Sequence, residues 1–150
     1  MTTRTAAGDV LTEIVMRTFR LNGQFLTAAE QIAKPVGLTA AWWQVLGAIL
    51  GDPAPVAGIA RSMGLRRQGV QRIADLLVER QLAEYVPNPA HRRAKLLRPT
   101  PAGRGAIQAL RPAQAEWADR VSAAVDVEEL RQALDVIDRL IAATSDRSAS

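Results

Sequence analysis

The chain has 150 residues, 48% of them hydrophobic and 23% charged, which is typical of one soluble globular domain and excludes collagen-like and disordered classes. With no cysteine and a single histidine, disulfides, thiolate catalysis and most zinc sites are excluded, and neither a metal nor a cofactor is expected. No apolar run is long enough for a membrane span, so we expect a cytoplasmic protein without a membrane partner.

The N-terminal third has a helical pattern. Apolar side chains recur every three to four residues over residues 9–34, which predicts a long amphipathic helix that Pro35 ends. Thr39 is placed to cap a second helix over residues 40–50. The glycine- and proline-rich run 51–55 predicts a turn.

The central segment has the spacing of a helix-turn-helix. Helices are predicted over residues 56–63 and 66–80, with Gly64 at the turn, where a positive φ is easily met only by glycine. Ala60 is small enough for two helices to cross closely above it. The residues expected beneath the crossing are Ile59, Met63, Leu65, Val70 and Ile73. In this motif the second helix enters the major groove of DNA.

A β-hairpin is predicted after the second of these helices. Apolar and polar residues loosely alternate over residues 82–86, a second short strand covers residues 95–98, and the tip between them is basic and framed by prolines. A helix-turn-helix followed by a two-stranded basic hairpin is a winged helix. The predicted fold class is therefore mainly α, with a small β-hairpin wing.

Two further helices are predicted at the C-terminal end. Thr100 and Pro101 supply an N-cap and a first-turn proline for one helix, which Pro112 interrupts. Asp126 caps the last helix, and the tail from residue 145 onward is expected to fray.

Basic charge is concentrated in the middle of the chain. The net charge is +4, yet residues 61–104 hold ten basic and three acidic residues, a net charge of +7, so that the remainder carries −3. Almost all of this charge is arginine, whose forked donors suit phosphate and guanine edges. A solvated basic face is the plain alternative, but the position of the cluster favours nucleic acid.

Several motifs resemble those of the MarR (multiple antibiotic resistance regulator) family. They are Gly37-Leu38-Thr39, Ile59-Ala60 with Met63-Gly64, Leu76-Leu77-Val78-Glu79-Arg80, Pro89-Ala90-His91-Arg92-Arg93 and Thr100-Pro101-Ala102-Gly103. The resemblance implies one domain over residues 1–150, with a winged helix-turn-helix at 39–100 and dimerisation helices at 9–34 and 101–145. It also implies a homodimer that binds a pseudo-palindromic operator in double-stranded DNA, usually as a repressor, and releases it on binding a small, often aromatic, anionic effector.

Eight residues are the candidate DNA contacts. Gln68, Gln71 and Arg72 are expected at base edges, and Arg66 and Arg67 at phosphates. The resemblance places Arg93 in the minor groove, with Arg92 and Lys95 as weaker candidates. A solvated helix face is the alternative.

The sequence departs from the family's pattern at several positions. His91 replaces the acid that usually pairs with a wing arginine, Gln81 stands at a usual glycine, Pro99 at a usual leucine and Gly69 at a usual serine or threonine. His91 alone makes no metal site, and an ordinary loop histidine is favoured over a pH-sensitive one.

Aromatic residues are the candidates for effector binding. Trp42, Trp43 and Phe19 could line a pocket, because family pockets lie beside the first two helices. Adjacent helical residues point about 100° apart, so both tryptophans can hardly face one cavity, and core packing of both is the alternative.

The sequence thus predicts a dimeric, ligand-responsive DNA-binding transcriptional regulator. The alternative is a helical protein-interaction or small-ligand-binding module that has lost DNA binding, which His91, Gly69 and Pro99 keep open. An enzyme is not expected, because no glycine-rich phosphate loop, cysteine nucleophile or supported acid pair is present.

Overall fold

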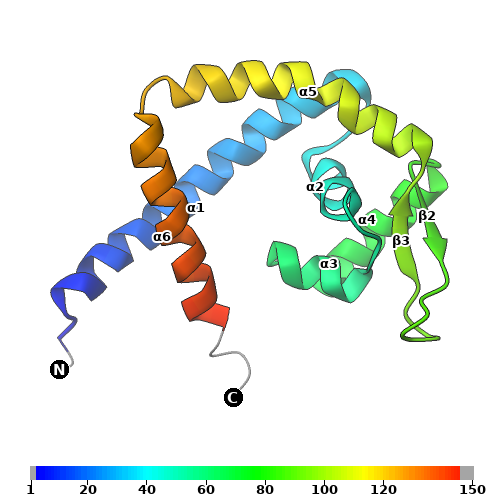
Figure 1. The fold of residues 1–150 in the computed structure, drawn as a ribbon, viewed down its shortest axis with the longest axis horizontal. Coiled ribbons are helices and arrows are strands. Elements are labelled where there is room, and N and C mark those ends of the chain that lie inside the picture. Colours follow the sequence, from blue (N-terminus) through cyan, green and yellow to red (C-terminus); the bar gives the residue numbers. More distant parts are fainter. Residues whose placement is uncertain (1–2, 146–150) are drawn as a thin grey trace. The chain divides into compact units, whose positions relative to one another are not determined.

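The structure, a computed structural model, describes residues 3–145 and is mainly helical, with a small antiparallel sheet (Figure 1). It divides into two compact units, Met1–Arg111 and Pro112–Ser150. The first unit contains α1 (Ala6–Ala33), a 3₁₀ turn (Lys34–Val36), α2 (Ala40–Ile49), β1 (Ala54–Pro55), α3 (Val56–Met63), α4 (Arg67–Glu79), β2 (Ala83–Val86), β3 (Leu96–Pro99) and the start of α5 (Pro101–Ser122). The second unit contains the rest of α5 and α6 (Val127–Ser145).

The start of α2 is fixed by two side-chain caps. Thr39 accepts a hydrogen bond from the Trp42 N–H at 3.1 Å, which confirms the predicted N-cap. The Glu30 carboxylate, near the end of α1, accepts a second bond from the Ala40 N–H at 2.7 Å. Because both caps satisfy N–H groups that have no partner within the helix, they join α1 to α2 at their shared end.

The helix-turn-helix has the predicted geometry at its turn. Gly64 ends α3 with φ +65, and the Leu65 N–H donates to the Ala60 carbonyl at 2.9 Å. Ala60 is buried where α3 passes the other helices, but Leu65 is 44% exposed, so its predicted burial is wrong. Its place just after the left-handed turn puts the side chain outside the helix crossing.

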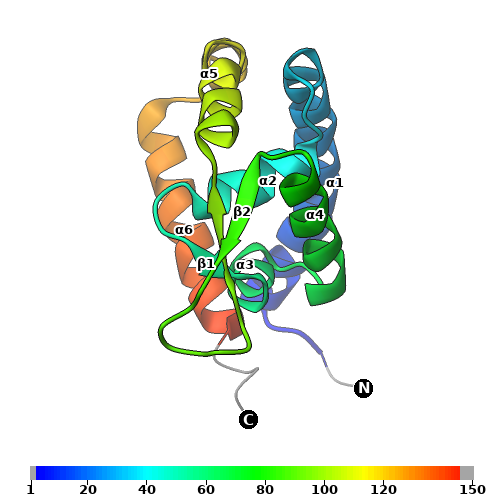
Figure 2. The same cartoon turned by 90° about the vertical axis from the view of Figure 1, so that its right-hand side faces the viewer.

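The sheet has three strands rather than two, in the order β1-β3-β2. Ala54 pairs with Leu97, so the predicted turn over residues 51–55 is wrong for its last two residues. Leu97 is fully buried and β1 pairs the edge of β3 that a two-stranded hairpin would leave open. The loop between β2 and β3 extends past α3 (Figure 2).

One continuous core lies beneath these elements. Its fully buried large side chains come from α2, α3, α4, β3 and α5, and they are Leu46, Ile49, Ile59, Leu77, Leu97, Leu110, Val45 and Val70. The described residues include no buried polar or charged side chain, so the core is held by apolar burial.

The junction between α4, the wing and α5 is tight. Gln81 turns the chain with φ +62, and the Thr100 hydroxyl donates to its carbonyl at 2.7 Å. The same hydroxyl accepts from the Gly103 N–H at 3.1 Å, which confirms Thr100 as the cap of α5. A Cβ on Gly103 would overlap the Leu82 carbonyl oxygen, so only glycine fits there.

In α5 and α6 the prediction is partly corrected. Pro112 does not interrupt the helix, since α5 continues through it to Ser122. Pro112 is, however, the first residue of the second unit. Asp126 accepts from the Glu128 N–H at 3.2 Å and caps α6 as predicted. The helix α6 has no buried residue. The tail is expected to fray from Ser145 onward, but Ser145 is the last residue of α6, and residues 146–150 lie outside the described part of the chain.

We predict that Gly103→Ala will lower the free energy of unfolding by about 3 kcal/mol or more, because the added methyl group meets rigid backbone. Gly105→Ala is the matched control, since a Cβ at this exposed position of the same helix meets nothing within 4 Å. This control should gain about 1 kcal/mol from helix propensity. Urea unfolding followed by circular dichroism measures both, and equal stability of the two variants would contradict the close approach.

Candidate nucleic-acid interface

The helix α4 has an inner face that is buried and an outer face that is exposed. Val70, Ala74 and Leu77 are buried at helical spacing, while Gln68 and Arg72 are exposed on the opposite side. This division follows from the 3.6-residue period of the helix, which places Val70, Ala74 and Leu77 on one face. The two residues predicted to meet base edges from this face therefore point to solvent.

The N-terminus of α4 is strongly cationic. Arg66 is its N-cap residue, without a side-chain cap, Arg67 is its first residue, and the first turn holds no acidic residue. Two cations at the positive end of a helix dipole are unfavourable in isolation. A phosphate group at this end would remove the conflict, because it is attracted both to the arginines and to the unpaired N–H groups.

The tip of the wing is an ordered turn. The Asn88 side chain accepts from the Ala90 N–H at 3.0 Å, and its carbonyl accepts from the His91 N–H at 3.3 Å. Pro87 and Pro89 restrict the backbone on either side. The turn thus orders the wing without the acid–arginine pair that His91 replaces. The exposed cations that follow it are Arg92, Arg93 and Lys95.

Three arginines of the basic segment have structural partners. Arg98 donates from Nε at 2.9 Å and Nη2 at 2.6 Å to Glu84, directly across the strands β2 and β3. Arg104 donates to the Leu50 carbonyl at 3.2 Å, and Arg80 lies 5.8 Å from the centroid of the Trp42 ring. The positive charge left for a partner is therefore concentrated on α4 and at the tip of the wing.

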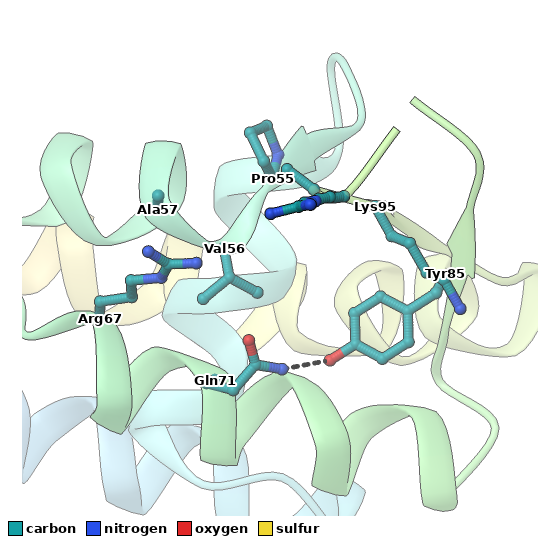
Figure 3. Close-up of a pocket in the computed structure, with 9 residues that line it drawn as sticks. Pro55, Val56, Ala57, Arg67, Gln71, Tyr85 and Lys95 are labelled. Atoms are coloured by element: carbon teal, nitrogen blue, oxygen red, sulfur yellow. Dashed lines mark hydrogen bonds between the residues drawn. The ribbon is translucent and has the colours of Figure 1, made fainter. Parts of the chain in front are cut away.

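A hollow of about 260 Å³ lies between the start of α3, α4 and the wing (Figure 3). Its cationic lining residues are Arg67 from α4 and Arg93 and Lys95 from the wing. None of these three makes an ion pair within the described part of the chain. The fold thus brings together charges that lie more than twenty residues apart in the sequence.

A hydrogen-bonded cluster joins α4 to β2. The Gln71 amide nitrogen donates to the Asp75 carboxylate at 3.0 Å. The same nitrogen donates to the Tyr85 hydroxyl at 2.9 Å (Figure 3). The hydroxyl donates to the same Asp75 oxygen at 2.6 Å. Burial, followed by the hydrogen bond and the charge of Asp75, raises the pKa of Tyr85 from 10.0 to about 12, although the bond from Gln71 opposes this.

Sequence reasoning missed two members of this cluster. Asp75 follows Gln71 by four residues, a spacing that places both side chains on one helix face and could have been noticed. Tyr85 lies on a different element, and only the folded chain brings it to α4. Gln71 itself, predicted at a base edge, is half-buried with its nitrogen directed toward β2.

The aromatic candidates for effector binding lie in two settings. Trp42 and Trp43 are half-buried and pack against the core, in line with the core-packing alternative, and Phe19 is 68% exposed on α1. A separate hollow of about 390 Å³ lies between α1, α2 and α4, and Leu26, Ala41 and Ile73 are among its apolar lining residues.

Within residues 3–145, no His, Asp and Glu side chains gather in a group of three that could hold a metal ion. In that same part of the chain, no helix is both long and apolar enough to cross a bilayer.

Comparison with known proteins gives a consistent result. The family model described as "MarR family" matches residues 36–94. An uncharacterized protein of Mycobacterium tuberculosis is 36% identical over 135 residues, which cover 90% of this chain and 94% of that protein.

Solved structures with a similar fold include one with bound DNA and one with a bound small molecule. A mutant MarR from Escherichia coli complexed with operator DNA has a TM-score of 0.75 at 15% identity, over 91% of this chain and 99% of that one. CouR from Rhodococcus jostii, bound to p-coumaroyl-CoA, has a TM-score of 0.75 at 24% identity, over 85% and 90%. The three-stranded sheet and the helix order are thus those of MarR-type winged helices, which confirms the predicted fold class.

We predict that the one tyrosine of the chain will ionise near pH 12. Absorbance at 295 nm follows Tyr85 alone, and Asp75→Asn should move the midpoint back toward 10 because it removes the charge that opposes tyrosinate. Since the pKa in the folded state lies above the value of 10.0 for a free tyrosine, this cluster stabilises the fold below pH 10 and loses that contribution between pH 10 and 12. A midpoint at 10 in the folded wild type would contradict the cluster.

Proposed function

The chain belongs to the MarR family of winged-helix transcription regulators, and from this premise we propose that it is a dimeric, sequence-specific DNA-binding regulator. We further propose that it acts as a repressor at a pseudo-palindromic operator, that a small aromatic or anionic effector releases it, and that it is not an enzyme. In this proposal it works in the cytoplasm, where the operator is accessible.

The main support for the proposal is that α4 and the wing both place cationic side chains around one hollow. Arg67 comes from the N-terminus of α4, and Arg93 and Lys95 come from the wing. Cations that are exposed and without an ion pair in the described chain retain their full attraction for an external polyanion. Duplex DNA offers phosphates on both sides of the groove that a helix enters, which matches a helix flanked by a wing.

The candidate contacts divide by their place in this arrangement. Gln68 and Arg72, on the outer face of α4, would meet base edges in the major groove. Arg66 and Arg67 would bind phosphates at the start of the helix. The wing residues Arg92, Arg93 and Lys95 would follow the backbone, with Arg93 entering the minor groove.

Dimerisation is supported by the apolar side chains that the helical ends leave uncovered. On α1 these exposed residues are Val10, Leu11, Ile14, Val15, Met16, Phe19, Leu21 and Phe25, and on α6 they are Val127, Leu130, Leu134, Val136, Ile137 and Ile141. Stripes of this extent are unusual on a monomer and indicate a protein interface. We propose that residues 9–34 and 101–145 form it, as the family resemblance implies.

An effector is supported by the fold and by one structural neighbour. CouR, which has a similar fold, is bound to p-coumaroyl-CoA in its crystal structure. Trp42, Trp43 and Phe19 remain our candidates for contacting an aromatic effector, with the half-buried tryptophans placed beside the core of the winged helix. Ligand that favours one arrangement of the two wings would shift the DNA-binding equilibrium.

We predict nanomolar binding to an operator upstream of the gene that encodes this chain, with a dissociation constant that rises steeply with salt concentration. Arg93→Ala should weaken binding about tenfold and reduce the magnitude of the slope of log K against log salt by about 1.8, since each of the two wings of the dimer loses one cation worth about 0.9. Arg111→Ala, which removes the same charge from α5, is the control and should change affinity little. Fluorescence anisotropy measures both.

The absence of any salt dependence would refute the phosphate contacts. If wild-type protein does not bind the DNA upstream of its own gene, a helical protein-interaction or small-ligand-binding module that has lost DNA binding becomes the better interpretation.

We also predict that Leu134→Asp will dissociate the dimer at micromolar concentration. Leu134 is 60% exposed on α6, so the variant should fold, but it would place a charge in the proposed interface. Gln132→Asp is the control, since it introduces the same residue at another exposed position of α6. Sedimentation equilibrium measures the mass, and a wild type that sediments as a monomer would contradict the dimer.

A further inference from the structure

We propose that Asp75 and Tyr85 are positioning residues that fix the amide of Gln71, so that Gln71 contacts the operator through its carbonyl oxygen alone. This inference rests on the proposed DNA-binding function and names the atom that faces the base. It concerns two residues that do not themselves need to touch DNA.

The chemistry of the cluster decides which end of the amide faces which way. The ionised Asp75 carboxylate can only accept hydrogen bonds, so the Gln71 atom 3.0 Å from it must be the nitrogen. The Tyr85 hydroxyl donates its one hydrogen to the same carboxylate oxygen and accepts from that nitrogen. Reversing the amide would direct its oxygen at the carboxylate, which is repulsive.

The cluster is anchored on two elements. Gln71 and Asp75 stand one helical turn apart on α4, and Tyr85 lies on β2, where it pairs with the fully buried Leu97 of β3. The amide is therefore held from the wing as well as from its own helix. Gln71 and Tyr85 are half-buried and Asp75 is exposed, so the cluster lies at the edge of the candidate interface rather than in the core.

The oxygen of Gln71 is directed the other way. In Figure 3 it points away from Tyr85 and toward the side chain of Val56, which lines the same hollow as Gln71, Arg67 and Lys95. Gln68, by contrast, is exposed on the outer face of α4, with no hydrogen bond of its side chain to another residue in the described chain. The two glutamines thus present different chemistry to a partner.

This orientation changes what Gln71 can recognise. A glutamine selects adenine by using its oxygen and its nitrogen together on N6 and N7 of the base. With its nitrogen held by Asp75 and Tyr85, Gln71 offers only an acceptor. It can then accept from the amino group of either adenine or cytosine, and it disfavours the guanine and thymine carbonyl oxygens.

The test is selection from a duplex library in which the operator is randomised. Gln71→Ala identifies the position that Gln71 contacts, once in each half-site. The double variant Tyr85→Phe with Asp75→Ala releases the amide, because it removes both hydrogen-bond partners. Glu84→Gln is the matched control, since it alters the neighbouring residue of β2 and its pair with Arg98 but not the cluster.

At the base that Gln71 contacts, wild-type protein should bind operators with adenine and operators with cytosine with affinities within about threefold of each other. Both should bind about fivefold more tightly than operators with guanine or thymine, as one hydrogen bond allows. The double variant should prefer adenine over cytosine by about tenfold, as a bidentate contact allows. Loss of the Asp75 charge will strengthen binding to all sequences alike, so the ratio between bases is the readout. Glu84→Gln should keep the wild-type ratio.

Three results would overturn the inference. They are a wild type that already selects adenine over cytosine tenfold, a double variant with the wild-type ratio, and a Gln71→Ala variant with unchanged preferences at every position. If the double variant does not fold, Asp75→Ala alone should shift the ratio toward adenine by a smaller factor. Failure of the wild type to enrich any sequence would refute the proposed function, and this inference with it.

Discussion

The close approach of α5 to the end of the α4–β2 turn is the constraint on which the winged helix depends. The Leu82 carbonyl accepts from the Thr100 N–H at 3.1 Å, and Gly103 leaves no side chain between this carbonyl and α5. The Thr100 hydroxyl closes the junction by donating to the Gln81 carbonyl and capping α5. Both ends of the wing are thereby tied to one point, so the orientation of β2 and β3 relative to α4 is fixed by backbone contacts.

With the wing fixed in this way, the charges of the basic segment separate into two groups. Arg98 and Arg104 stabilise the scaffold, through a cross-strand ion pair and a bond to the carbonyl of Leu50. The cations on α4 and at the wing tip have no such partner among the described residues, and three of them, Arg67, Arg93 and Lys95, line one hollow. Net charge alone does not separate the two groups. The separation depends on which arginines have a carboxylate or a carbonyl group nearby.

The polar cluster of Gln71, Asp75 and Tyr85 lies beside the second group, since Gln71 and Tyr85 line the same hollow as Arg67, Arg93 and Lys95. It places an acid at the edge of the candidate interface, where it would repel phosphate, and the inferred role of orienting a neighbouring side chain accounts for an acid at this place. The raised pKa of Tyr85 has the same origin, because the carboxylate that accepts from the hydroxyl also disfavours its ionisation. The proposed function thus assigns affinity and specificity to different side chains of one surface.

The sequence by itself determined the elements that local chemistry controls. The cap at Thr39, the left-handed turn at Gly64, the span of α3 and the cap at Thr100 follow from residues within four positions of each other, and each is present in the structure. The tertiary structure decided what depends on distant residues: the third strand at Ala54, the exposure of Leu65, the continuity of α5 through Pro112 and the contact of Tyr85 with Gln71. Sequence spacing reports on neighbours along the chain, whereas pairing and burial depend on which segment the fold places opposite.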